Sequence, residues 1–509
     1  MNQRFAAGIL VAGALLYIAA FGWSIVNLSY DMWGAFVVIP PLSVLGVLAL
    51  RRMFPGDLQQ IATILSFGLF VKFAGAAARY WVGFEAYDGG IDAQRYHDYA
   101  AERATSVWSG ESSVWSLVPD GFGTPFMEDA TAIIYAFTGA SKLAGFFVFA
   151  WIAYMGTAWF VKAASIAIPG FLNRRYAVLC ALAPSIVYWP SSIGKEAWMF
   201  LTLGLGTYGV ARVLSRRGLA ASVVIALVGL LAAAMVRPHM AGLWLAGVLP
   251  ALVVLLFARD SGEQRRVRGG DRLAVAGAIV LAAVGLVIAA GATLRYLDFS
   301  DETGDVTAIS IIEETSRRTQ QAGSSFEPPS VSSPTEWPYA SVRTLTRPLL
   351  IEARGAGQLL SALEVTALLG VALISWRRVA NLPRLVAATP YLTFAMTVLF
   401  FGSLAFTSFA NLGVLTRQRT LLFPFLLLVL CVPTRAERAA RRTAEAESRA
   451  IEDEHRSLVE AERARLRPAP IEVPAGWHRS DSSSGSPWKP AVRRGGGVGR
   501  SRPDPDGIW

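Results

Sequence analysis

Long apolar runs separated by short polar connections dominate the first 432 residues of the chain. Residues 7–28, 219–236 and 273–292 contain no charged side chain, and each run approaches the roughly 20 residues that a helix needs to cross the hydrocarbon layer of a bilayer. A helix satisfies its own backbone hydrogen bonds, and these runs lack the alternation of membrane-barrel strands. The pattern therefore predicts an all-α fold, a polytopic transmembrane helix bundle.

The apolar runs predict twelve spans. They cover approximately residues 7–28, 33–50, 60–81, 142–166, 176–189, 196–214, 219–236, 239–258, 273–294, 358–375, 386–408 and 418–432. The first run follows Arg4, but it is too long for a secretory signal and no small-residue cleavage pattern opens a soluble domain after it. We therefore expect it to be a retained helix.

Arginine-rich short connections orient the predicted bundle. With the N-terminus inside, the cytoplasmic side receives Arg51, Arg52, Arg174, Arg175, Arg216, Arg217, the 259–272 cluster, Arg377, Arg378 and Arg384. Cationic short loops stay in the cytoplasm, so both termini are expected there, in a multi-pass protein of the cell membrane. The connections 84–141 and 295–357 then become two long outer loops.

The region after the last apolar run has a different composition. Residues 1–432 are the predicted transmembrane domain, 433–468 a charged cytoplasmic helix rich in Ala, Glu and Arg, and 469–509 a disordered cytoplasmic tail. The formal net charge of the whole chain is +10. That charge suits anionic membrane lipids, and no nucleic-acid module is evident. The two cysteines, Cys180 and Cys431, lie in apolar runs and suggest neither a disulfide nor a metal pair.

The first outer loop is acidic, with nine carboxylates and two arginines in residues 84–141. Solvation of an exposed loop explains any one of these carboxylates equally well. If a helix starts at Asp92, then Asp92, Tyr96 and Tyr99 share one face. Asp92 is then either the helix N-cap or a general base for a sugar hydroxyl, and it is also suited to orient a divalent metal ion. The neighbouring Asp88 is a second candidate.

A turn broken by Pro and Ser at 183–196 joins two predicted spans. Irregular polar backbone at membrane depth is tolerated only where protein or a water-filled cavity surrounds it. Lys195 is therefore a candidate phosphate contact, and Glu196 is its partner. The alternative for Lys195 is snorkelling at the membrane interface.

Three basic groups on the predicted outer side are candidates for binding a lipid phosphate or pyrophosphate, because guanidinium forks match phosphate oxygens. They contain Arg237 and His239; Arg347, Glu352 and Arg354; and Arg417 and Arg419. Each arginine alone is equally compatible with an interfacial anchor. Five of them beside an acidic loop favour a phosphate site.

Residues 60–215 resemble the GT-C superfamily of integral-membrane glycosyltransferases. The similarity lies in the acidic loop with its Asp-containing helix and in the Pro184-Ser185 turn leading to Lys195 and Glu196. In that superfamily the loop aspartate usually follows the first span, whereas here it follows the third. The resemblance implies that Asp92, or Asp88, is the catalytic base. Tyr96 and His97, which follow Asp92 in the same segment, are candidate substrate-binding residues. The resemblance also implies that Lys195 and Glu196 line the donor cavity.

The last part of the chain is similar to O-antigen polymerases. The residues that carry this similarity are Asn411-Leu412-Gly413, then Arg417-Gln418-Arg419 and Pro424. In those proteins the arginines of the final outer loop grip a polyprenyl pyrophosphate. Both resemblances imply a polyprenyl-linked sugar donor used on the outer face of the membrane.

These patterns together predict a membrane glycosyltransferase. It would move sugar, with suspected inversion, from a polyprenyl-phosphate donor to a glycan or lipid-linked acceptor. One alternative is an O-antigen-type polymerase or ligase that uses a pyrophosphate-linked glycan. Another is a lipid-linked glycan transporter, although transporters usually place polar residues near the bilayer midplane and show repeats, which this sequence lacks.

Overall fold

The computed structural model describes residues 3–89, 91–171, 173–257, 269–296, 315–317, 319–320, 325–353, 355–465, 477–479 and 488–490. The chain divides into two compact units, Met1–Arg438 and Ala439–Trp509. The second unit contains most of helix α20 (Arg435–Arg465) and one antiparallel pair of short strands, β1 (Trp477–Arg479) and β2 (Trp488–Pro490). The candidate site lies in the first unit.

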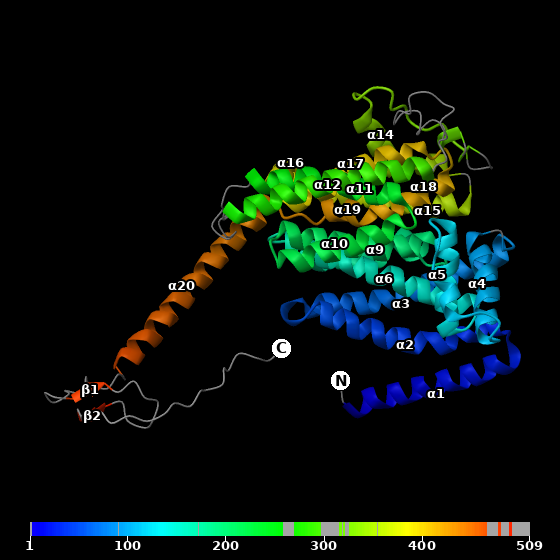
Figure 1. Ribbon diagram of the computed structural model, residues 1–509, viewed down its shortest axis with the longest axis horizontal. Coiled ribbons are helices and arrows are strands. Elements are labelled where there is room, and N and C mark those ends of the chain that lie inside the picture. The colour runs from blue at the N-terminus through cyan, green and yellow to red at the C-terminus, as the bar shows by residue number, and fades with distance from the viewer. Residues whose placement is uncertain are drawn as a thin grey trace, which may run out of the picture. The chain divides into compact units, whose positions relative to one another are not determined.

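Helices form almost all of the first unit's described structure (Figure 1). Its first half contains α1 (Gln3–Asn27), α2 (Tyr30–Met53), η1 (Gly56–Leu58), α3 (Gln59–Trp81), η2 (Val82–Ala86), α4 (Asp92–Trp108), η3 (Val114–Leu117), α5 (Thr124–Thr138), α6 (Lys142–Ala167), α7 (Asn173–Leu182), α8 (Pro184–Tyr188) and α9 (Lys195–Leu214). Its second half contains α10 (Leu219–Ala234), α11 (Pro238–Phe257), α12 (Gly269–Tyr296), α14 (Trp337–Thr346), η4 (Leu350–Glu352), α15 (Ala356–Ile374), α16 (Trp376–Ala388), α17 (Pro390–Ala405), η5 (Phe406–Ser408), α18 (Leu412–Arg419), η6 (Thr420–Leu422) and α19 (Phe423–Val429).

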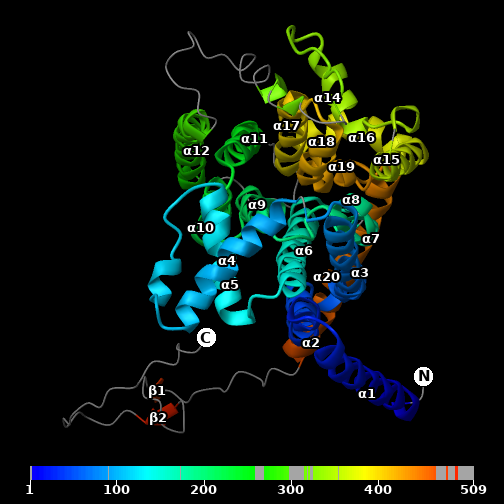
Figure 2. The ribbon, with the colours of Figure 1, turned by 90° about the vertical axis from the view of Figure 1, so that its right-hand side faces the viewer.

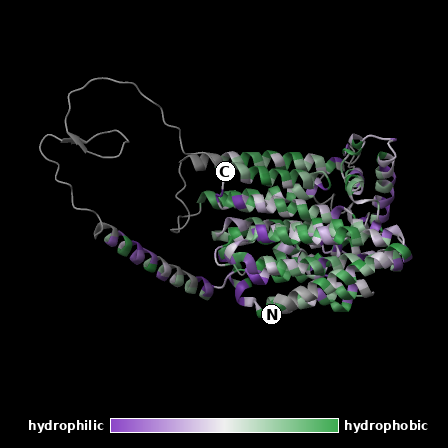
Figure 3. Ribbon diagram, turned by 90° about the horizontal axis from the view of Figure 1, so that it is seen from below, coloured by the Kyte–Doolittle hydropathy of each residue, from purple (hydrophilic) through white to green (hydrophobic). Residues whose placement is uncertain are grey.

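Nine helices within the described residues are long and apolar enough to cross a membrane, and two more apolar helices, Val11–Asn27 and Leu219–Ala234, are shorter. The nine are Tyr30–Met53, Gly56–Ala86, Lys142–Ala167, Lys195–Leu214, Pro238–Phe257, Val275–Arg295, Gly357–Ile374, Pro390–Ser408 and Leu412–Val429. Hydrophobic residues run along the bundle helices and hydrophilic ones gather toward the helix ends (Figure 3). The fold is therefore that of an all-helical, multi-pass membrane protein.

The predicted span at 176–189 does not form one helix of spanning length. It consists of α7 and the five-residue α8, which Pro184 separates because proline disfavours helical backbone at the residue before it and has no N–H to donate. The Ser185 N–H donates to Glu364 Oε1 at 2.9 Å, and the Ser185 hydroxyl donates to the other Glu364 oxygen. In the middle of α8, the fully buried Lys72 donates to the Ile186 carbonyl at 2.7 Å. Two buried ionisable side chains thus make hydrogen bonds to the backbone of this interruption.

Helices α6, α9 and α10 pack at very close range. A Cβ atom on Gly156 of α6 would lie 2.1 Å from the Phe200 carbonyl oxygen of α9, and one on Gly204 of α9 would lie 2.3 Å from the Gly156 carbonyl oxygen. Only glycine fits at both positions, as in the small-residue contacts of membrane helices. This packing fixes α9, whose first turn carries Lys195 and Glu196.

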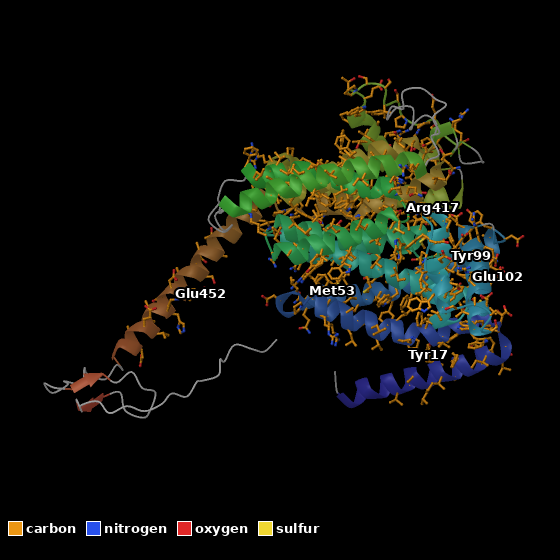
Figure 4. All side chains as sticks on the ribbon, viewed as in Figure 1. Tyr17, Met53, Tyr99, Glu102, Arg417 and Glu452 are labelled. Carbon is orange, nitrogen blue, oxygen red and sulfur yellow. The ribbon has the colours of Figure 1, made fainter. Side chains whose placement is uncertain are left out.

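One end of the bundle, here named the loop end, carries α4 and α5, which run across the ends of the longer helices rather than along them (Figures 1 and 2). These two helices belong to the predicted loop 84–141. The predicted loop 295–357 contains α14 and η4, while its residues 297–314, 318, 321–324 and 354 lie outside the described residues. The opposite end of α2 and α3 contains Met53, which Figure 4 labels far from Arg417.

Candidate functional site

Charged side chains from four distant segments meet at the loop end. Asp92 begins α4, Glu196 lies in the first turn of α9, Arg237 precedes α11, and Arg417 lies on α18. The Arg417 Nη1 atom is 2.9 Å from Asp92 Oδ2, and its Nε atom is 3.2 Å from Glu196 Oε1. The Arg237 Nη2 atom is 2.9 Å from the same Glu196 oxygen. We name these four residues the cavity cluster.

Helix α4 begins at Asp92, as the sequence predicts, but Asp92 is not its N-cap. Ile91 occupies the cap position in extended backbone with no side-chain cap, and the Asp92 carboxylate accepts a hydrogen bond from Arg417. The cap interpretation is therefore wrong, because Asp92 is already the first helical residue, one position after the cap, and its carboxylate is bound to Arg417 and not to a free backbone N–H of the helix. Asp88 occupies the preceding turn with φ of 48°, outside the residues that line the cavities described next.

Two cavities share Asp92, Glu196 and Arg417 in their walls. The first, of about 140 Å³, is lined by Arg79, Ile91, Asp92, Ala93, Ser192, Ile193, Gly194, Glu196 and Arg417. The second, of about 160 Å³, is lined by Asp92, Arg95, Tyr96, Thr124, Lys195, Glu196, Arg237 and Arg417. Five different basic side chains and two carboxylates line them, so the walls carry a net positive charge that favours an anionic ligand.

The second cavity also contains hydrogen-bond donors. Lys195 Nζ donates to Thr124 Oγ1 at 2.9 Å, and Arg237 Nη1 donates to Gln418 Oε1 at 2.7 Å. Burial raises the pKa of Tyr96, and the nearby charges of Asp92 and Glu196 raise it further. Tyr96 is therefore a neutral phenol that can donate a hydrogen bond to a ligand oxygen.

Sequence reasoning missed Arg79 and Arg95 as cavity residues. Arg79 lies in the last turn of α3, where its guanidinium is about 5 Å from the ring centres of Tyr188 and Trp189 and donates to the Tyr188 hydroxyl at 3.2 Å. Arg95 pairs with Glu128 at 2.8 Å. The sequence feature that could have identified Arg79 is its position about one turn before the acidic loop begins.

The two predicted histidines lie outside the cavity walls. His97 Nδ1 is 2.8 Å from the Tyr135 hydroxyl, so His97 joins α4 to α5, and burial lowers its pKa. His239 occupies the first turn of α11, two residues after Arg237. Neither histidine is among the residues that line the two cavities.

A second charged group lies in the predicted loop 295–357. Glu352 accepts hydrogen bonds from Arg343, from Arg347 Nε at 3.0 Å and from the Leu349 N–H at 2.9 Å. The fully buried Arg419 donates from Nη1 to the Leu345 carbonyl at 3.2 Å and to the Arg347 carbonyl. We name Arg343, Arg347, Glu352 and Arg419 the loop clamp.

The predicted basic groups therefore separate into two places. Arg237 and Arg417 lie in the cavity cluster, whereas Arg347, Glu352 and Arg419 form the loop clamp. Arg354 lies outside the described residues. Of the predicted site residues, Asp92, Tyr96, Lys195, Glu196, Arg237 and Arg417 line the cavities.

No group of three or more His, Cys, Asp or Glu side chains in the described part of the chain is arranged to hold a metal ion. The fold defines the class of the protein as a multi-pass membrane protein, by the length and composition of its helices. No protein-family model, curated protein or solved structure matches the chain.

Proposed function

We propose that the chain is a membrane glycosyltransferase that moves sugar from a polyprenyl-phosphate donor to a glycan or lipid-linked acceptor. One observation carries the proposal. Arg237 and Arg417 converge within 3.2 Å of a single Glu196 oxygen, and Asp92 is in contact with the same Arg417. Guanidinium groups suit a phosphate leaving group, and a carboxylate suits an acceptor proton.

The proposed chemistry uses these groups in one step. The acceptor hydroxyl oxygen attacks the anomeric carbon, the bond from that carbon to the phosphate oxygen breaks, and its electron pair leaves with the polyprenyl phosphate. Asp92 takes the hydroxyl proton, while Arg237, Arg417 and Lys195 stabilise the negative charge that develops on the phosphate.

The ion pair between Arg417 and Asp92 sets an order for this step. While Arg417 donates to Asp92, that carboxylate oxygen is occupied and is not available to an acceptor hydroxyl. A donor phosphate that attracts Arg417 would free Asp92 to accept a proton. The proposal therefore includes donor binding before proton transfer.

The arginines at the opposite end support an outer location for the site. Arg51 and Arg52 close α2 beside Met53, and Arg377 and Arg378 lie in the first turns of α16. Met53 and Arg417 are at opposite ends of the bundle (Figure 4). Cationic connections stay in the cytoplasm, so the loop end is proposed to face outward.

A second candidate is a polysaccharide polymerase or ligase that uses a pyrophosphate-linked glycan. The contact between Arg417 and Asp92 favours this second candidate. The contact joins the last part of the chain, which resembles the polymerases, to the first loop. The two candidates share a polyprenyl-linked donor and differ in whether one sugar or a whole repeat unit moves.

The test is mass analysis of envelope glycans and polyprenyl intermediates in a deletion strain, complemented with wild type or with the Asp92→Asn variant. Accumulated lipid-linked monosaccharide supports the glycosyltransferase, and accumulated lipid-linked repeat units support the polymerase. Unchanged glycans and intermediates in the deletion strain would refute both. Intermediates trapped on the cytoplasmic leaflet would instead indicate a transporter.

A further inference from the structure

The connection that contains α4 and α5 exposes an unusual set of large apolar side chains although it lies outside the spanning helices. We name this set the aromatic edge; it consists of Trp108, Val114, Trp115, Val118, Phe122 and Phe137. Trp115 is 82% exposed and Phe137 is 85% exposed. Single exposed apolar residues are ordinary on protein surfaces, but six within 30 residues mark an interaction surface.

The local structure of η3 keeps two of these side chains, Val114 and Trp115, exposed. Ser113 caps η3 by accepting from the Trp115 N–H, and the η3 turn buries Leu117 while Val114 and Trp115 remain exposed. Arg103 fastens this turn to α4 by donating to the Ser116 carbonyl. Trp115 is therefore exposed on a turn that hydrogen bonds hold in place.

Figure 2 looks from the loop end toward the bundle and shows where this segment lies. Helices α4 and α5 and the connection between them extend sideways past α6 and α10. Helix α10, one of the two shorter apolar helices, exposes Val224, Leu227, Val228 and Leu231, an apolar surface suited to lipid. The connection that carries the aromatic edge thus lies beside this exposed apolar surface, at the level where the bundle helices end.

The position and composition of the aromatic edge together indicate which environment it contacts. Trp and other aromatic side chains favour the boundary between lipid headgroups and acyl chains, and an element lying in that plane buries its apolar side there. The exposed Arg95, Asp98 and Glu102 of α4 supply a polar side, and Glu102 lies at the outermost part of the loop end in Figure 4. We infer that the aromatic edge inserts into the headgroup layer of the membrane leaflet at the loop end.

This inference does not depend on the proposed function, and lipid quenching tests it directly. Trp115→Cys and the matched control Glu102→Cys are each labelled with an environment-sensitive fluorophore in full-length protein lacking the buried Cys180 and Cys431. The proteins are placed in phosphatidylcholine nanodiscs with a spin-labelled lipid whose nitroxide lies near the headgroup. We expect at least threefold stronger quenching at position 115 than at position 102.

Equal, weak quenching at both positions would overturn the inference. A label at 115 that is unquenched in nanodiscs but shielded in native membranes would also overturn it, and would assign the surface to a protein partner. The Trp115→Ser variant adds an independent check. Its thermal unfolding in detergent should match wild type, whereas a clear loss of stability would mean that Trp115 packs inside the protein.

Discussion

The cavity cluster and the loop clamp contain the same kinds of side chain but use them differently. In the cavity cluster, Arg417 and Arg237 pair with carboxylates beside two hollows. In the loop clamp, Arg419 is fully buried and donates to backbone carbonyls, and Glu352 accepts from a backbone N–H as well as from arginines. An arginine held by carbonyls stabilises the fold, whereas one held by carboxylates at a cavity can exchange them for a ligand.

Replacement of Asp92 should have the largest effect. Asp92→Asn removes the proton acceptor but keeps the size of the side chain, so sugar transfer from a polyprenyl-phosphate donor should fall about a hundredfold or more. Thermal unfolding should stay close to wild type, because the Asp92 side chain is 63% exposed. Asp88→Asn is the control and should retain activity. A folded Asp92→Asn protein with full activity would contradict the catalytic role.

Arg419→Ala should lower the free energy of unfolding by about 2 kcal/mol, because it removes a fully buried side chain and leaves two partly buried carbonyls without their charged donor. The measurement is thermal unfolding in detergent. Arg417→Ala, two residues away on the same helix, is the matched control and should unfold near the wild-type temperature. If the two variants were equally stable, the distinction between clamp and cavity would fail.

Arg417→Ala should instead weaken donor use, raising the KM for the polyprenyl-phosphate donor roughly tenfold through the loss of a charge-assisted hydrogen bond. Arg417→Lys should restore only part of the donor use that Arg417→Ala loses, since lysine cannot make a bidentate contact with phosphate. Wild-type kinetics in the Ala variant would show that Arg417 is an interfacial anchor.

The smallest effect concerns the pH dependence of the loop clamp. Burial opposes ionisation of Glu352, but hydrogen bonds from Leu349 and Arg347 and the charge of Arg343 hold its pKa below the usual range. The clamp's contribution to stability is therefore present above the unfolded carboxyl pKa of about 4.3 and is lost as the pH falls through the lower folded value. Glu352→Gln should lose less stability than wild type over that acid range. The measurement is thermal unfolding of both proteins as the pH is lowered. An equal loss of stability in wild type and Glu352→Gln would contradict the prediction.

The sequence predicts the nine span-length helices of the described residues and the start of α4, because apolar runs and a Gly-rich turn are local signals, but of the twelve predicted spans two form shorter helices and 176–189 is broken. It also supplies Asp92, Glu196, Arg237 and Arg417 as candidates. It does not separate Arg417 from Arg419, since their environments depend on which side of α18 faces the cavity and which faces α14. The buried partners of α8, Lys72 and Glu364, come from helices about 115 and 180 residues away in sequence, so no local pattern pairs them.

The glycine contact between α6 and α9 has a mechanical consequence for the cavities. Gly156 and Gly204 bring the two backbones so close that sliding one helix past the other would drive carbonyl oxygens into neighbouring atoms. The wall that carries Glu196 is therefore the stationary one. Widening that admits a ligand would then involve the other cavity walls, two of which, α4 and α18, are joined by the ion pair between Asp92 and Arg417.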